Sequence, residues 1–288
     1  MQISNEEYQK YKPLLFSLGY RLLGSITEAE DIVQETFLRA YNVNEEKIDN
    51  KKAYLCKMMT NRCLDVLKSA RVQREQYIGP WNPEPLIMEN HQEDNPIDIL
   101  LEKEGLSIAY LRMMENLSPV ERAVIILRDV FDSPYIEISE IVDKKVEHCR
   151  KIYGRSKAKL VKVENESLHY DKNKYVIDQF ITALQMQHKE QLLDLLSDNI
   201  TLFSDGGGKV LAALRPIESR NKVSAFLNGL IKKAGNDYGY EIRKVNGQPS
   251  ILFFMEGKLH SVISFYIENN TINEIYITLN PEKLTSYQ

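Results

Sequence analysis

Two basic segments with helical periodicity, set far apart in the chain, constrain its fold more than any other feature. Residues 51–74 hold seven basic residues and one acid, and residues 144–162 hold eight and one, although the formal net charge of the chain is −4. Blocks of one sign at two places are typical of surfaces that bind a phosphate backbone. One such block is commonly a solvated helix face. Two blocks inside patterned helices favour a nucleic-acid-binding protein.

Chain length and cysteine content narrow the class of protein to which the chain can belong. A single core rarely grows beyond about 250 residues, so these 288 residues predict two or three domains. No apolar run approaches the roughly 20 residues of a membrane span, and the N-terminus lacks the order of a signal peptide, so we expect a cytoplasmic protein that contacts no membrane. Cys56, Cys63 and Cys149 match no zinc spacing, and core packing is favoured over a redox switch. No metal and no cofactor are expected.

The apolar spacing from Tyr8 to about Ala70 predicts three helices, the last of which carries the first basic segment. Ser25 or Thr27 is the expected N-cap of the second, because acidic residues follow. Residues 77–104 differ, since they are rich in proline and acids. They predict a linker rather than a packed element. Three interpretations of its acidity stay open: it repels free DNA, folds over a basic face, or only keeps the chain soluble.

The second basic segment closes a predicted helix-turn-helix. Helices are expected over residues 119–130, 135–142 and 145–162, with serine caps and first-turn prolines at Ser118-Pro119 and Ser133-Pro134. The last helix should bury its apolar stripe and turn a basic face outward, as a reader of the major groove requires. The outward side chains expected to bind DNA are Lys145, His148, Arg150, Lys151 and Arg155.

The sequence that follows Lys162 predicts an α+β domain. Helices are expected over residues 172–186, 189–196 and 217–233, and strands over 199–204, 210–214, 238–245, 250–255, 259–267 and 271–279. Gly247, Gly257 and Asn269-Asn270 are hairpin signals between the last strands. The order predicts an antiparallel sheet folded around helices, which can enclose a pocket.

From Tyr8 to Lys162 the chain resembles the extracytoplasmic-function class of the sigma-70 family of bacterial RNA polymerase sigma factors. Residues 29–41 (AEDIVQETFLRAY) are similar to the helix that grips the clamp helices of the polymerase β′ subunit. Phe37 also fits core packing. The resemblance implies core RNA polymerase and promoter DNA as partners and assigns polymerase binding to Asp31, Gln34, Glu35, Phe37 and Arg39.

Two further motifs carry the resemblance. Residues 53–65 (AYLCKMMTNRCLD) are similar to the helix that opens and reads the minus-ten promoter element, with Tyr54 where tryptophan is frequent. Residues 117–128 and the helix-turn-helix are similar to the domain that reads the minus-thirty-five element, although Asp143-Lys144-Lys145 departs from the usual turn. Minus-ten contacts are expected from Lys57, Asn61, Arg62, Asp65 and Arg71.

Three motifs, at residues 81–85 (WNPEP), 205–209 (DGGGK) and 280–284 (NPEKL), are similar to those of the subgroup with a fused SnoaL-like C-terminal domain. The resemblance implies that this domain regulates the factor in place of a separate anti-sigma protein. The expected fold is two all-α sigma domains (residues 1–76 and 105–164) joined by an acidic linker (77–104) and followed by a cone-shaped α+β SnoaL-like domain (165–288). The expected regulatory contacts are Trp81, Asn82, Pro83, Glu84, Pro85, Asp205, Gly206, Gly207, Gly208, Lys209, Asn280, Pro281, Lys283 and Leu284.

Functions other than that of a sigma factor also fit parts of the sequence. By themselves, the three glycines are better explained by a tight turn between strands than by a contact site. A pocket in the C-terminal domain could make the protein an enzyme or a small-molecule sensor. Catalysis would need an acid and a base, and Asp205 and His260 are the available candidates, but no nucleophile, metal or nucleotide motif supports an enzyme. A repressor or activator that uses only the helix-turn-helix leaves the first basic segment unexplained. We expect a promoter-recognition subunit whose C-terminal domain docks on Trp81 to Pro85 and holds the two DNA-binding domains closed.

Overall fold

The computed structural model describes residues 3–43, 48, 50–75, 77–88, 106–160, 169–235 and 238–285, with the side chains of 70–75 excepted. These residues form two compact units. We call residues 3–75 and 113–160 the helical unit, and residues 77–88, 106–112 and 169–285 the sheet unit. Each unit is described by itself. Within the described residues, no helix is both long enough and apolar enough to cross a membrane.

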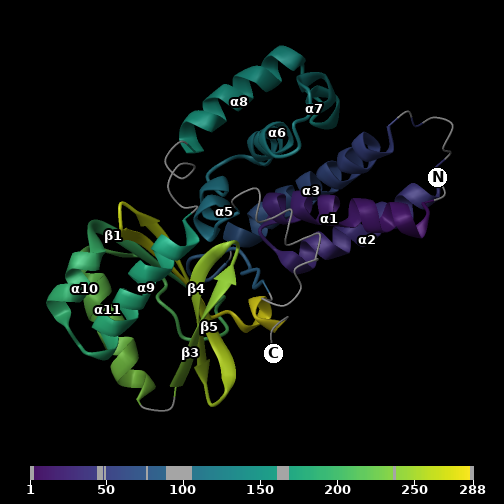
Figure 1. Ribbon diagram of the computed structural model, residues 1–288. Coiled ribbons are helices and arrows are strands. Elements are labelled where there is room, and N and C mark those ends of the chain that lie inside the picture. Colours follow the sequence, from purple (N-terminus) through teal and green to yellow (C-terminus); the bar gives the residue numbers. More distant parts are fainter. Residues whose placement is uncertain are drawn as a thin grey trace. The chain divides into compact units, whose positions relative to one another are not determined.

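Three antiparallel helices open the helical unit (Figure 1): α1 (Asn5–Leu23), α2 (Ile26–Tyr41) and α3 (Lys51–Glu75). Ser4 and Glu7 form a capping box at the start of α1, and Gly24 ends that helix at a φ of 68°. The hydroxyl of Ser25 accepts from the amide of Glu28, so Ser25 and not Thr27 caps α2. Such caps satisfy amides that lack partners within the helix.

The predicted helix-turn-helix is confirmed: α6 (Pro119–Asp129), α7 (Tyr135–Ile141) and α8 (Val146–Leu160) follow α5 (Ile108–Met114). Ser118 and Glu121 form a capping box on α6. The expected cap at Ser133 is wrong, because Pro134 is the N-cap of α7 and no side chain bonds to that helix end. Ser133 instead uses its backbone, since its carbonyl accepts from Arg128 at 3.0 Å.

The helices of the two sigma-like segments pack directly on one another. α1 and α3 contact α6, and α3 also contacts α7. Arg122 of α6 is 4% exposed, donates to the carbonyl of Leu22 and lies 2.7 Å from the carboxylate of Glu115. A buried guanidinium with two acceptors gives this contact a defined geometry.

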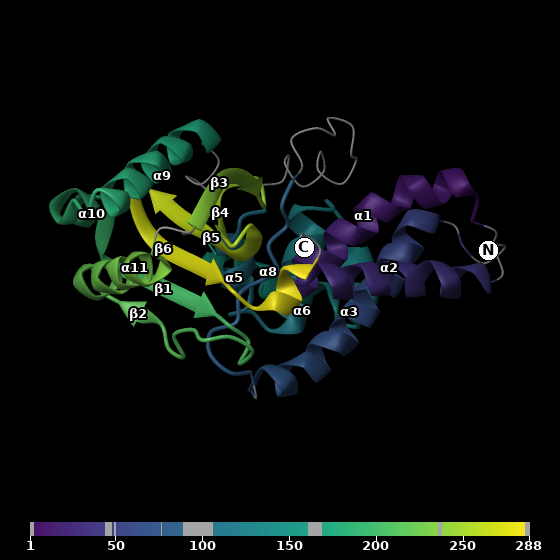
Figure 2. The same cartoon turned by 90° about the horizontal axis from the view of Figure 1, so that it is seen from below.

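The sheet unit has six strands in the order β2-β1-β6-β5-β4-β3, and the helices cover one face (Figure 2). The predicted α+β class is confirmed; every neighbouring strand pair is antiparallel except β1 with β6, which are parallel. The elements are α9 (Tyr170–Gln185), α10 (Lys189–Leu195), β1 (Leu196–Asp205), β2 (Ile217–Glu218), α11 (Arg220–Ala234), β3 (Tyr238–Val245), β4 (Gln248–Met255), β5 (Lys258–Glu268), β6 (Thr271–Thr278) and the 3₁₀ helix η2 (Pro281–Lys283).

One strand prediction is wrong. Residues 210–214 form no strand, and β2 lies at Ile217–Glu218, where a helix was expected to begin. Leu211 and Leu214 are 86% and 67% exposed, so the apolar composition that suggested a strand marks a surface loop. Only two residues pair with β1 before Ser219 turns into α11.

The expectation that the linker is not a packed element is also wrong for residues 77–88. Asn82, Glu84 and Met88 are between 0% and 4% exposed, and Ile87 forms a β-bridge with Val245. An extended, proline-containing segment can run along a sheet, because prolines are tolerated where their missing amide has no ladder partner. Residues 89–105 lie outside the described part of the chain.

Candidate functional site

The side chains predicted to contact polymerase lie mostly on the surface of α2. Asp31, Gln34 and Arg39 are exposed, and Glu35 is partly exposed. Phe37 points inward instead: it is 8% exposed, and its ring lies 4.6 Å from that of Tyr8. Its side chain therefore packs α2 on α1.

An ion pair joins the predicted polymerase helix to the predicted minus-ten helix. Arg62 of α3 lies 2.7 Å from a carboxylate oxygen of Glu35, and Arg39 pairs with the other oxygen. The hydrogen bond from Arg62 is the main reason that the pKa of Glu35 is lowered. The pair positions Arg62 beside α2 while leaving its side chain 40% exposed.

The other predicted minus-ten residues are also reachable by solvent. Asn61 and Asp65 are exposed and Lys57 is half-buried, with Asp65 3.1 Å from Lys68. The side chain of Arg71 lies outside the described residues. Cys56 and Cys63 are buried on the opposite side of α3, where burial raises the pKa of the Cys56 thiol to about 12. Both cysteines are thus core residues, as the sequence favoured.

The basic segment on α8 divides into two faces. All five side chains predicted to bind DNA are exposed, while Cys149 and Ile152 are buried. Lys157 and Lys159 belong to neither set, because they pair with Asp129 and Glu121 of α6 at 2.8 and 2.9 Å. Burial alone would raise the pKa of Glu121, but bonds from Ser118 and Lys159 lower it to about 2. The outward face is therefore the part of the segment available to phosphates.

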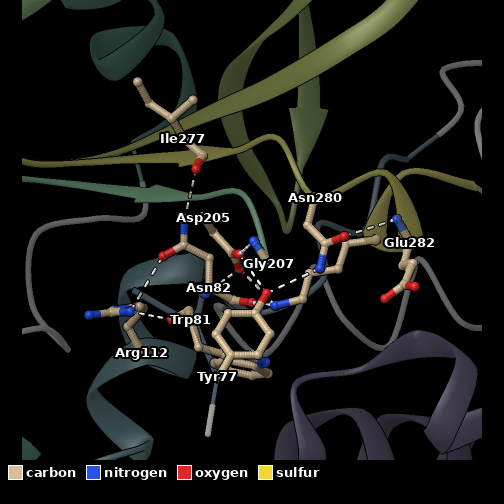
Figure 3. Close-up of polar contacts among 10 residues, drawn as sticks. Tyr77, Trp81, Asn82, Arg112, Asp205, Gly207, Ile277, Asn280 and Glu282 are labelled. Atoms are coloured by element: carbon tan, nitrogen blue, oxygen red, sulfur yellow. Dashed lines mark hydrogen bonds and ion pairs between the residues drawn. The ribbon is translucent and has the colours of Figure 1, made fainter. Parts of the chain in front are cut away.

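In the sheet unit, the predicted regulatory residues converge on the carboxylate of Asp205 (Figure 3). Asp205 ends β1 and is 0% exposed. One carboxylate oxygen accepts from the Tyr77 hydroxyl at 2.6 Å and the Gly207 amide at 3.1 Å. The other accepts from the Asn82 amide and from Lys283 Nζ, each at 2.8 Å. We call Tyr77, Asn82, Asp205 and Lys283 the clamp.

Lys283 and Asn82 extend the clamp in two directions. Lys283 also donates to the Asn82 carbonyl, and its Nζ lies 4.2 Å from the centroid of the Trp81 ring. The side-chain amide of Asn82 donates to the carbonyl of Ile277 at 3.2 Å (Figure 3). A cation over an indole face is attracted by the ring quadrupole. The single tryptophan of the chain thus lies against Lys283 of the C-terminal motif.

The glycine run is a turn that also makes contact. Gly207 and Gly208 have φ values of 59° and 70°. A Cβ on Gly207 would lie 2.4 Å from the side-chain nitrogen of Asn280, and one on Gly208 would lie 2.8 Å from Ile78. The run is a turn that follows β1 but does not lead into a second strand, and side chains on Gly207 and Gly208 would collide with the C-terminal motif and the linker. Its regulatory role stays a prediction.

The outer residues of the three motifs complete the contact. Lys209 pairs with Glu282 at 3.0 Å, but both are more than half exposed. Pro83, Glu84 and Pro85 are buried. Leu284 is 1% exposed and joins a core cluster against which Ile87 packs. Pro281 begins η2, whose N-cap is Asn280.

Three residues at this site were missed by the sequence argument. Tyr77 supplies the hydroxyl on Asp205, Asn246 accepts from the Leu86 amide at 3.0 Å, and Arg112 donates to the Trp81 carbonyl. Arg112 also lies 4.0 Å over the ring of Phe203. Asn246-Gly247 was visible only as a hairpin turn. No local pattern marks Tyr77 or Arg112.

The proposed catalytic pair is not assembled. The Asp205 carboxylate is occupied by its four donors, whereas His260 lies on β5 with its ring 6.3 Å from that of Phe253. The described residues around Asp205 place no histidine against it.

Comparisons with known proteins match both helical segments to described families. The family described as Sigma-70 region 2 matches residues 7–72, and Sigma-70, region 4 matches residues 107–160. The chain is 31% identical over 138 residues to the ECF RNA polymerase sigma factor SigW of Bacillus subtilis, covering 46% of this chain and 73% of that one. It is 29% identical over 241 residues to SigJ of Mycobacterium tuberculosis, covering 82% of this chain and 75% of SigJ.

The likeness to SigJ extends over the whole fold. The crystal structure of the M. tuberculosis extracytoplasmic function sigma factor SigJ superposes with a TM-score of 0.80 at 23% identity and covers 98% of each chain. The sheet unit is therefore part of the shared architecture, alongside the helices that precede it.

Proposed function

Because the chain belongs to the extracytoplasmic-function sigma factors with a fused SnoaL-like domain, and so directs core RNA polymerase to promoters, we propose that its own sheet unit restrains this activity. The restraint acts on residues 77–88 and 106–112, the described ends of the segment between the two sigma domains. One observation carries the proposal: the buried Asp205 carboxylate accepts two of its four hydrogen bonds from the linker residues Tyr77 and Asn82.

The contacts with polymerase and promoter are assigned to surfaces of the helical unit. Asp31, Gln34, Glu35 and Arg39 on α2 face the clamp helices of the polymerase β′ subunit. The exposed residues of α3 engage the minus-ten element, where cations capture the backbone of extruded bases. The outward face of α8 engages the minus-thirty-five element. The assignment is supported by the exposure of these side chains and by the two matched families.

Promoter binding requires the two sigma domains to lie farther apart than they do in the packed helical unit. The two promoter elements are separated by about 25 base pairs, or roughly 85 Å of duplex axis. α1 and α3 nevertheless pack directly on α6. The sigma domains must therefore separate when both elements are bound. A linker held at both ends by one body cannot extend fully, so the clamp opposes that separation.

Electrostatics explain why the clamp is strong. A buried carboxylate is costly unless it is paired and hydrogen-bonded. Tyr77 and Asn82 supply two of the four donors to Asp205, so releasing the linker leaves the carboxylate with Lys283 and Gly207. This restraint lies within the chain, and we propose that no separate anti-sigma protein is needed for it. The site of action is the cytoplasm, where the polymerase and its promoters are found.

The decisive experiment is transcription in vitro with bacterial core RNA polymerase on a library of random promoters. We compare the full chain with Asp205→Asn and Trp81→Ala, and we expect more specific transcript from both variants. Lys209→Met is the matched control, since Lys209 lies in the same loop but its ion pair is exposed. It should behave as the wild type. Equal transcript from all four folded proteins would overturn the restraint.

A further inference from the structure

A cavity of about 530 Å³ lies between the helices and the sheet of the sheet unit. That volume falls within the range of pockets that hold small molecules. α9, α11, β3, β4, β5 and residues 210–213 contribute to its wall. The wall is mainly apolar, with rings and branched chains that include Phe180, Phe226, Ile251, Phe253, Ile263 and Ile277. Among the described residues that line it there is no carboxylate, and the lysine in the wall is Lys233.

Polar side chains interrupt the apolar wall, namely those of Gln185, Tyr238, Tyr240, His260 and two serines, and the two serines are the buried ones. Ser204 and Ser261 are 2% and 3% exposed, and both line the cavity. Within the described ranges, the structure shows no hydrogen bond between either serine hydroxyl and another residue. Buried hydroxyls nearly always have a partner. An apolar space with two such groups matches a ligand that is mostly hydrocarbon and carries one or two hydrogen-bonding oxygens.

The cavity shares its strands with the clamp. Successive side chains of a strand point to opposite faces, so Ser204 faces the cavity while Asp205 faces the linker. The side chain of Ile277 lines the cavity, and its carbonyl accepts from Asn82. Leu279 also lines the cavity, and its amide donates to the Asp205 carbonyl at 2.8 Å. A ligand that shifts these strands shifts the groups that hold the linker.

We propose that this cavity binds an uncharged, largely apolar small molecule with one or two hydrogen-bonding oxygens, and that its occupancy alters the hold on the linker. The binding site stands on the cavity alone. The effect of occupancy on the linker rests on the proposed restraint by the sheet unit. Occupancy would then connect promoter recognition to a small molecule.

Binding is tested with the full chain and the uncharged dye N-phenyl-1-naphthylamine, whose emission rises in apolar surroundings. Leu230 lines the cavity and is 40% exposed, so Leu230→Glu puts a charge at the wall without burying it deeply. Tyr175→Glu is the matched control on α9, because Tyr175 is 64% exposed and outside the wall. We expect saturable one-to-one binding to the wild type and the control, weakened at least about tenfold by Leu230→Glu. No saturable binding, or equal binding by Leu230→Glu, overturns the site.

The two hydroxyls are tested by competition. Ser204→Ala with Ser261→Ala should weaken displacement of the dye by 1-naphthol about 2- to 10-fold, the range for one neutral hydrogen bond. Displacement by naphthalene, which has no hydroxyl, should not change. An equal effect on both competitors would overturn the stated ligand class.

Coupling to the linker is read from Trp81, the one tryptophan of the chain. We add 1-octanol, which does not absorb with tryptophan, at a concentration that displaces the dye. The Trp81 emission should change in the wild type and not in Leu230→Glu. If octanol binds and the emission is constant, the coupling is wrong while the binding site stands. If Asp205→Asn also leaves transcription unchanged, the restraint itself is wrong.

Discussion

At the scale of single residues, burial separates the contacts that hold the linker from those that only lie nearby. The Asp205 carboxylate is fully buried and Lys283 is 12% exposed, whereas Lys209 and Glu282 are 54% and 65% exposed. Exposed ion pairs contribute about 0–1 kcal/mol. Loss of one partner by a buried polar group lowers the free energy of unfolding by more than that, because water does not replace the lost partner. The linker therefore depends on the clamp.

Tyr77→Phe removes one donor to Asp205 and keeps the ring. We expect the free energy of unfolding of the sheet unit to fall by about 1.5–3 kcal/mol, the range for a hydrogen bond to a charged group. Urea unfolding followed by Trp81 emission measures it. Tyr240→Phe, at a ring that is 40% exposed, should change stability by less than about 0.5 kcal/mol. Similar losses from both would show that the clamp bond is unimportant.

The same variant has a defined pH dependence. The pKa of Tyr77 is raised, by burial first and then by its bond to the Asp205 carboxylate. The folded state thus keeps a proton that the unfolded state loses above its pKa of about 10. This stabilisation is complete below that pH and is lost as the pH rises through the folded-state pKa. The stability gap between wild type and Tyr77→Phe should shrink above pH about 10; a constant gap would contradict it.

At the scale of elements, α8 shows that net charge overstates a nucleic-acid surface. Lys157 and Lys159 count toward the basic segment but are paired with acids of α6. Lys145 and Lys151 are exposed on the outward face. Only unpaired cations release counterions when a phosphate binds, so the paired lysines contribute less.

A salt titration of promoter binding by the polymerase holoenzyme tests this division. Lys151→Met should reduce the slope of log K against log salt by about one, as expected for one lost phosphate contact. Lys159→Met on the same helix should leave the slope nearly unchanged, because Lys159 is bound to Glu121. Equal slopes for the two variants would place the DNA elsewhere.

At the scale of the whole molecule, the proposed function requires parts that pack together to separate. The hydrogen bond from Arg122 to the Leu22 carbonyl joins the two sigma-like segments. In the proposed mechanism, promoter binding opposes that contact, and the clamp limits how far the linker can extend. Binding energy from polymerase and DNA must therefore offset both, because a ligand shifts a conformational equilibrium only by its differential affinity for the two states.

Spin labels on Ser69→Cys and Ala158→Cys measure the separation, since both positions are exposed on α3 and α8. The native cysteines are buried, which slows their labelling. We expect the distance distribution to lengthen when core polymerase and promoter DNA are added. The control pair Asn42→Cys and Ser69→Cys, within the first sigma-like segment, should not change. An unchanged distribution for the first pair would contradict the opening.

Much of the element structure could be predicted, because its causes are local. The caps at Ser25 and Ser118, the helical stripes and the basic segments are all read within a few residues. The strand expected over residues 210–214 failed for the same reason, since apolar composition does not say whether a partner strand is near. The docking of Trp81 was predicted from a family motif, and Tyr77 and Arg112 had no such motif.

The sequence by itself determined the helices, the helix-turn-helix, the sheet class and the two basic surfaces, because periodicity and charge act over short distances along the chain. Only the tertiary structure decided that Tyr77, Asn82 and Lys283 meet at Asp205. Asp205 is far from each of these donors in the sequence, and a buried carboxylate takes whichever donors the packed fold brings to it. The tertiary structure also decided which side chains of β1 face which neighbour, since Ser204 lines the cavity and Asp205 contacts the linker.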